Sequence, residues 1–225
     1  MTGAVSVPNQ PALTFAMGQE SAIPLLIGTT TRENRFPSGM PFSDFRSFIQ
    51  REAGPLAPRI LAKYGLEHSA HGADDPKYGA ATDQLFADIA FRCPAVLEAQ
   101  WHADAGNAVY QYEFERPMPG RSYALHAFEL PYVFGEFPKT GWGMTGHFSA
   151  TDYRLSDLME RYWTNFAKTG SPNAPGLPPW PRFGQDGRYI QFLKDGRVAS
   201  ARNLREAQCS LYRKWIVTQM HSAPR

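Results

Sequence analysis

The alternation of apolar and polar stretches along the chain predicts a mixture of strands and helices. Ile23–Ile27 is a short apolar run that ends at Gly28, a pattern typical of a strand buried on both faces. Asn107–Phe114 is rich in valine and tyrosine and predicts a second strand. Arg188–Leu193 and Arg197–Ser200 flank an Asp-Gly pair, which predicts a hairpin.

Apolar side chains at helical spacing predict helices over residues 42–52, 58–64, 79–104, 152–168 and 203–219. Asp152–Lys168 has the clearest apolar stripe, and Gly170 should end this helix. Pro94 is expected to kink or split the helix over 79–104, and Asn203 is a candidate N-cap of the last helix. Loops are predicted for residues 1–20, 66–78 and 116–150.

This order of elements predicts an α/β fold with a mostly parallel sheet flanked by helices. The predicted strands are few for so much helix, because an open α/β sheet has both faces covered and usually contains more strands. The chain is therefore expected to form part of a larger sheet.

Composition and charge exclude several classes of protein. The chain has 225 residues and a net charge of +2, so no strong field would attract nucleic acid. No apolar run approaches the roughly 20 residues of a membrane span. Residues 1–31 contain no Lys or Arg, so no targeting signal is expected within the chain, and any such signal would lie upstream. Cys93 and Cys209 form either one disulfide or two reduced, buried thiols.

Two loops carry candidate chemistry. Glu33 follows the first predicted strand and His126 follows the second. Active sites of open α/β sheets lie beyond the carboxyl ends of strands, and an acid followed by a histidine is the order of the last two triad members in α/β-hydrolases. Two solvated loop residues are the alternative interpretation.

A second cluster of possible ligands lies in the polar insertion, where the sequence HSAHGADD places His68, His71, Asp74 and Asp75 close together. A metal site needs three or four convergent ligands on an ordered frame. A solvated insertion is the simpler interpretation of this segment, and no metal is assigned to it.

Several blocks occur in a characteristic order: IPLLIGTTTRENRF, FRCP, VYQYEF, LHAFELPYVFG, LMERYWTNFAKTGSPN and WPRF. Together they resemble the C-terminal portion of the type-B carboxylesterase family, which includes the cholinesterases and bacterial para-nitrobenzyl esterases. The resemblance runs from about Pro24 to Trp215.

The resemblance implies particular roles. His126 matches the catalytic base, and Glu33 matches the triad acid, although Asn34 stands where the family usually has glycine. Phe36 resembles an aromatic residue of the substrate pocket, and Glu129 matches a buried acid beside the histidine.

Cys93 and Cys209 resemble a disulfide pair of secreted members of the family. The implied activity is hydrolysis of small carboxylic esters by a serine mechanism without cofactor or metal.

The nucleophile of such an enzyme is missing from the chain. No Gly-x-Ser-x-Gly sequence occurs, and Ser21 and Ser122 lie in imperfect versions of it that lack the strand–turn–helix context. Residues 1–225 are therefore expected to be the C-terminal portion of a single domain. Its upstream half, with the nucleophile elbow, would be needed for activity. The alternatives are a non-catalytic, cholinesterase-like binding protein or an inactive fragment.

Overall fold

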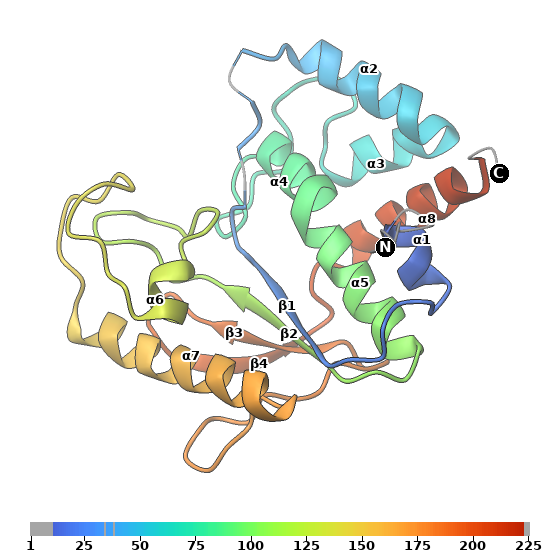
Figure 1. Cartoon of the computed structure of the whole chain (residues 1–225). Coiled ribbons are helices and arrows are strands. Elements are labelled where there is room, and N and C mark those ends of the chain that lie inside the picture. The colour runs from blue at the N-terminus through green and yellow to red at the C-terminus, as the bar shows by residue number, and fades with distance from the viewer. Residues whose placement is uncertain (1–10, 34, 38, 223–225) are drawn as a thin grey trace, which may run out of the picture.

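A four-stranded sheet forms the centre of the computed structural model, which describes residues 11–33, 35–37 and 39–222 (Figure 1). The strands follow the order β1 (Leu25–Thr30), β2 (Val109–Phe114), β3 (Arg188–Phe192) and β4 (Val198–Arg202). The first three strands are parallel, and β4 returns antiparallel to β3. The predicted α/β fold with a mostly parallel sheet and a terminal hairpin is confirmed.

Helices cover both faces of this sheet, with α5 on one side and α7 on the other (Figure 1). In chain order the helical elements are α1 (Pro11–Ala16), α2 (Phe42–Ala53), η1 (Gly54–Leu56), α3 (Ala57–Lys63), α4 (Ala81–Ala87), η2 (Asp88–Arg92), α5 (Cys93–Asp104), α6 (Leu130–Phe134), α7 (Ala150–Thr169) and α8 (Glu206–Ser222).

The central strand β2 is buried along its whole length because both of its faces are covered. Its alternate residues Tyr110, Tyr112 and Phe114 pack in one core with the α7 stripe. Val109 points to the other face and packs with Ala99 of α5. This two-sided burial explains why the strand sequence lacks a simple apolar–polar alternation.

The predicted first strand is displaced along the chain. It begins at Leu25, after Pro24, and continues through Gly28 to Thr30, so Gly28 does not end it. Gly28 lies opposite Tyr112 in the parallel register, and a Cβ atom at this glycine would come within 2.3 Å of the Tyr112 ring. The glycine therefore makes room for an aromatic side chain on the neighbouring strand, and it does not form a turn.

Three further local predictions need correction. Residues 11–16 of the predicted N-terminal loop form α1, while residues 1–10 lie outside the described part. Residues 130–134 of the predicted long loop form α6. Asn203 does not cap α8: it has a φ of 58°, its N–H donates to the Gly187 carbonyl at 2.9 Å, and the helix begins only at Glu206.

The helix predicted over residues 79–104 is divided, but not by a simple kink at Pro94. A π-helical turn, η2, separates α4 from α5 and ends immediately before Cys93. Pro94 is the second residue of α5, which follows the π-turn without a break in the helix. The π-turn, with the extra backbone that it contains, therefore ends at Arg92, two residues before Pro94.

A disulfide joins Cys93 at the start of α5 to Cys209 in the first turn of α8. The two cysteines are 116 positions apart in sequence. In the chain-entropy account, closing so long a loop stabilises the fold by about 5 kcal/mol. Of the two states that composition left open for these cysteines, the structure contains the bridge.

Asp152 fixes the start of α7 through its buried carboxylate. It accepts hydrogen bonds of 2.7 Å from the Ser149 backbone N–H, from the Arg116 guanidinium and from the Tyr132 hydroxyl. Burial alone would raise the pKa of Asp152, but the hydrogen bonds from Arg116, Ser149 and Tyr132 outweigh burial and lower the pKa to about 2.

Asp152→Asn is expected to lower the free energy of unfolding at pH 7 by roughly 1–3 kcal/mol, because it removes the charge that these donors stabilise. The folded-state pKa lies below the ordinary value of 3.8, so this stabilisation is present above about pH 4 and is lost as the pH falls toward 2. Melting temperatures of the two proteins should therefore converge with acidification. The exposed Asp157→Asn on the same helix is the control, and a difference that does not change with pH would contradict the prediction.

Candidate active site

Glu33 lies three residues beyond the end of β1 and is 6% exposed. One of its carboxylate oxygens, Oε1, accepts a hydrogen bond of 2.5 Å from the backbone N–H of Thr30. The last residue of the strand thus holds the carboxylate at the carboxyl end of the sheet. The other oxygen, Oε2, remains available for a second partner.

That second partner is His126, whose Nδ1 atom is 2.6 Å from Glu33 Oε2. His126 lies in the loop that follows β2, the strand paired directly with β1. Because β1 and β2 are parallel, their carboxyl ends meet at one edge of the sheet, and residues 93 positions apart come into contact. The two loops also pair directly, since the Arg32 N–H donates to the Ala124 carbonyl at 3.0 Å.

The outer nitrogen of His126 faces away from this bond. Its side chain is 56% exposed, and in the described residues Nε2 has no hydrogen-bond partner. A carboxylate on Nδ1 fixes the tautomer in which Nε2 can accept a proton. The pair therefore has the geometry of a general base and its orienting acid.

His102 forms a second histidine–carboxylate pair, with a different character. Its Nδ1 is 2.7 Å from Glu20 Oε1, and its Nε2 is 2.7 Å from the Ile23 carbonyl oxygen. The imidazole is buried, and both of its nitrogens are occupied. His102 therefore ties α5 to the segment before β1 and has no nitrogen left for a substrate.

Glu129 lies close enough to the pair for electrostatic interaction with both Glu33 and His126, but it hydrogen bonds to neither. Burial raises its pKa, its own backbone N–H opposes this effect, and the Glu33 charge adds to the increase. Its Oε2 atom is buried without a hydrogen-bond partner in the described part of the chain. Glu33, and not Glu129, is the carboxylate in contact with the imidazole.

The aromatic side chain next to the imidazole is Phe91, a residue not predicted from the sequence. Its ring centroid lies 5.0 Å from that of His126. Phe91 is part of η2, so the π-turn places it over the site. Phe36 instead packs against Phe45 and Phe86 of the neighbouring helices, with centroids 4.9 and 6.4 Å apart.

The two serines considered in the sequence lie away from any nucleophile elbow. Ser21 is exposed before β1, and Ser122 is exposed in the irregular loop before His126. Within the described ranges, neither serine is hydrogen bonded to His126.

The polar insertion has a structural use for its aspartates. The Asp74 carboxylate accepts a hydrogen bond from the Ala81 N–H, and the Asp75 carboxylate accepts bonds from the Lys77 and Tyr78 N–H groups. Within the ranges that the structure describes, no group of three or more His, Cys, Asp or Glu side chains could hold a metal ion.

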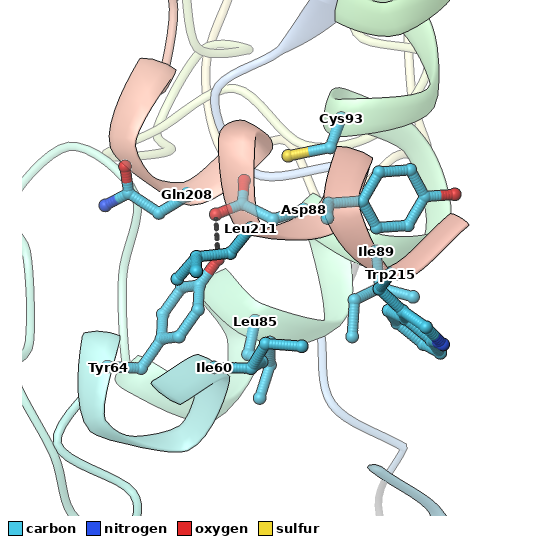
Figure 2. A pocket seen from close by; sticks show the side chains of 10 residues that line it. Ile60, Tyr64, Leu85, Asp88, Ile89, Cys93, Gln208, Leu211 and Trp215 are labelled. Atoms are coloured by element: carbon cyan, nitrogen blue, oxygen red, sulfur yellow. Dashed lines mark hydrogen bonds between the residues drawn. The ribbon is translucent and has the colours of Figure 1, made fainter. Parts of the chain in front are cut away.

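An apolar crevice between α3, α4, η2 and α8 is lined in part by Cys93, and His126 is not among its lining residues (Figure 2). Tyr64 donates a hydrogen bond of 2.7 Å to Asp88 within it. Its volume of about 10 Å³ holds at most one water molecule. This crevice is therefore a feature of helix packing and not a ligand site.

A mostly parallel sheet covered by helices, with a histidine–carboxylate pair at its carboxyl edge, is the arrangement of an α/β-hydrolase beyond its nucleophile strand. The model of the carboxylesterase family matches residues 2–212, nearly the whole chain. The chain therefore belongs to the carboxylesterase family.

Curated relatives agree with this membership, and solved structures agree with the fold. The chain is 28% identical to carboxylesterase 5A of Felis catus over 93% of its own length, and 30% identical to the liver carboxylesterase of Sus scrofa over 84%. A thermophilic PNB esterase structure matches 91% of the chain with a TM-score of 0.70 and 25% identity. A second PNB esterase matches with a TM-score of 0.67 and 24% identity.

The matched region is only part of each relative. The chain covers 41% of the feline carboxylesterase, 36% of the porcine enzyme and 41% of the thermophilic esterase. It thus spans about two fifths of the length of the proteins that it resembles. Among the described helices, none is both long and apolar enough to cross a bilayer.

Proposed function

We propose that this chain supplies the base and the acid of a serine carboxylesterase, with His126 as the base and Glu33 as the acid. The observation that supports this most is the 2.6 Å contact between His126 Nδ1 and Glu33 Oε2, combined with an exposed and unpartnered Nε2 in the described structure. Membership of the carboxylesterase family supports the same reaction class.

In this proposal the nucleophile is a serine in the portion of the domain that precedes this chain. His126 Nε2 accepts the proton of the serine hydroxyl while the serine oxygen attacks the ester carbonyl. Glu33 stabilises the resulting imidazolium, which then donates the proton to the leaving alcohol. Water hydrolyses the acyl-enzyme when His126 acts as base again, and the serine is regenerated.

Two surfaces support the proposal that residues 1–225 form the C-terminal portion of one larger domain. Strand β1 pairs with β2, and in the described residues no strand pairs with its other edge. An unpaired parallel edge is normally covered in a native protein. The coverage of about two fifths of each relative is consistent with a preceding segment that completes the sheet.

The second surface is a hollow of about 500 Å³ beside α6 and α7, lined by Tyr112, Val133, Phe134 and Trp163 among others. Phe134 is 69% exposed there, and Leu130 is also exposed. Exposed apolar groups of this size on one face indicate a surface that another part of the protein covers. We assign that role to the preceding portion of the same domain.

The proposed substrates are small carboxylic esters, in keeping with the names of the carboxylesterase and PNB esterase relatives. The test uses the product of the complete gene and p-nitrophenyl acetate as substrate. It should hydrolyse this ester and lose activity on reaction with a fluorophosphonate, which modifies activated serines. A folded product with neither property would instead be a non-catalytic member of the family and would overturn the proposal.

A further inference from the structure

Two arginines flank Glu33 in the sequence, and both contact Tyr123 in the loop that carries His126. The guanidinium carbon of Arg32 lies 3.9 Å from the centroid of the Tyr123 ring, a cation–π contact. Arg35 donates a hydrogen bond of 2.7 Å from Nη2 to the Tyr123 hydroxyl. We refer to these three residues as the Arg32–Tyr123–Arg35 clamp.

Arg32 is itself held on its other side by the polar insertion. Its Nε donates to the Lys77 carbonyl at 3.1 Å, and its Nη2 donates to the Pro76 carbonyl at 2.9 Å. Gly79, with a φ of +93°, lies against the same guanidinium, because a Cβ atom there would come within 3.1 Å of Nη1. The planar fork of the guanidinium therefore bonds to two carbonyls through its edge while its face stacks on a ring.

The insertion is a firm support because it is bound to the central strand. Lys77 Nζ lies 2.7 Å from Glu113 Oε2, and the Tyr78 hydroxyl donates to Glu113 Oε1 at 2.8 Å. Glu113 is a fully buried residue of β2. Arg32 thus connects Tyr123 to the same strand whose continuation leads to His126.

The loop before His126 needs such support. Residues 115–125 contain neither helix nor strand apart from the isolated bridge between Arg32 and Leu125. His126 is half-exposed and has a single hydrogen-bond partner in the described residues. Ordering an irregular backbone costs about 1–2 kcal/mol per residue in conformational entropy. Contacts close to His126 must offset this cost if the loop is to keep the imidazole in one position.

We propose that Arg32 and Tyr123 are positioning residues that hold the His126 loop at hydrogen-bond distance from Glu33. This inference rests on the proposed function, since it assigns the clamp to the same base and acid. Tyr123 lies three residues before His126, and Arg32 directly precedes Glu33, so one stacked contact joins the two loops at the pair. Neither residue touches the reacting atoms.

The test measures kinetics of the complete gene product with p-nitrophenyl acetate. Tyr123→Leu, which removes both the ring and the hydroxyl, should lower kcat roughly ten- to hundred-fold, because displacements near 1 Å have effects of this size. KM should change less than three-fold, since no substrate contact is removed. Arg32→Lys should also lower kcat, because lysine cannot stack and bind two carbonyls together.

Tyr123→Phe and Arg197→Lys serve as matched controls. The phenylalanine keeps the stacked ring and loses only the bond to Arg35, so it should retain most of kcat. Arg197 lies in the exposed β3–β4 turn, and its replacement should leave kcat unchanged. Circular dichroism and melting curves establish that each variant is folded.

Proton NMR provides a readout that does not depend on turnover. The Nδ1 proton shared by His126 and Glu33 should resonate downfield of the amide region and disappear in His126→Ala. We expect it to persist in Tyr123→Phe and to broaden in Tyr123→Leu. A wild-type kcat and a sharp resonance in folded Tyr123→Leu would overturn the positioning role proposed for Arg32 and Tyr123. Activity retained in His126→Ala would instead overturn the proposed function itself.

Discussion

Replacing His126 by alanine should lower kcat of the complete gene product for p-nitrophenyl acetate roughly 10⁴- to 10⁶-fold, because loss of a triad base has effects of this size. The imidazole is the group that moves the proton in both acylation and deacylation. The other buried histidine–carboxylate pair cannot replace it, since His102 has both nitrogens occupied. KM is expected to change little, because proton transfer is required only as the transition state forms.

His147→Ala provides the matched control for this substitution. His147 is also an exposed loop histidine, in the segment before α7, and its replacement should leave kcat within two-fold of the unmodified protein. Stopped-flow measurement of p-nitrophenol release would show whether acylation is the step that fails. Retention of activity within a few-fold in folded His126→Ala would exclude the assigned base.

Glu33→Gln should lower kcat roughly 10³- to 10⁴-fold. The glutamine keeps the shape of the side chain but removes the negative charge that orients and stabilises the imidazolium. It can also present an N–H to Nδ1, which favours the wrong tautomer. Thr30 would lose a charge-assisted hydrogen bond to Oε1, so the strand end would hold the side chain less firmly.

Glu129→Gln tests whether the effect is specific to the acid in contact with His126. Because burial raises the pKa of Glu129, a neutral amide is a closer substitute there than at position 33. We expect a decrease in kcat of less than ten-fold. If Glu129→Gln were as damaging as Glu33→Gln, the assignment of Glu33 as the only orienting acid would be wrong.

The elements with strong local signals were predictable from the sequence. The apolar stripe of α7 recurs with helical period, and Leu155, Met159 and Tyr162 are fully buried as that pattern requires. Strand β2 and the Asp195-Gly196 hairpin follow from equally local rules. The order of Glu33 and His126 after successive strands left two solvated loop residues as an alternative, and the resemblance to the carboxylesterase family favoured the pair.

Features that depend on distant partners were not predictable. The sequence predicts that Gly28 ends the first strand. In the structure this glycine lies inside the strand, because the Tyr112 ring of the neighbouring strand occupies the space beside it. The π-turn and the position of Phe91 against His126 depend on how α4 and α5 pack. Phe91 belongs to the FRCP block, but that block did not predict a contact with His126.

The residues next to Glu33 show the same limit. The sequence predicts no role for Arg32, and residues 66–78 resemble a solvated insertion. In the structure they bind one another and support Tyr123. Pairing between an arginine, two carbonyls and a ring separated by more than forty positions leaves no local pattern in the sequence.

The intact mass of the natural gene product, measured before and after reaction with a fluorophosphonate, tests the central claim most directly. The claim predicts a protein of more than twice the 25.2 kDa of this chain that gains one phosphonyl group on a single serine. A folded natural product of 25.2 kDa that gains no adduct would contradict it. In that case His126 and Glu33 would form a hydrogen-bonded pair without a nucleophile to activate.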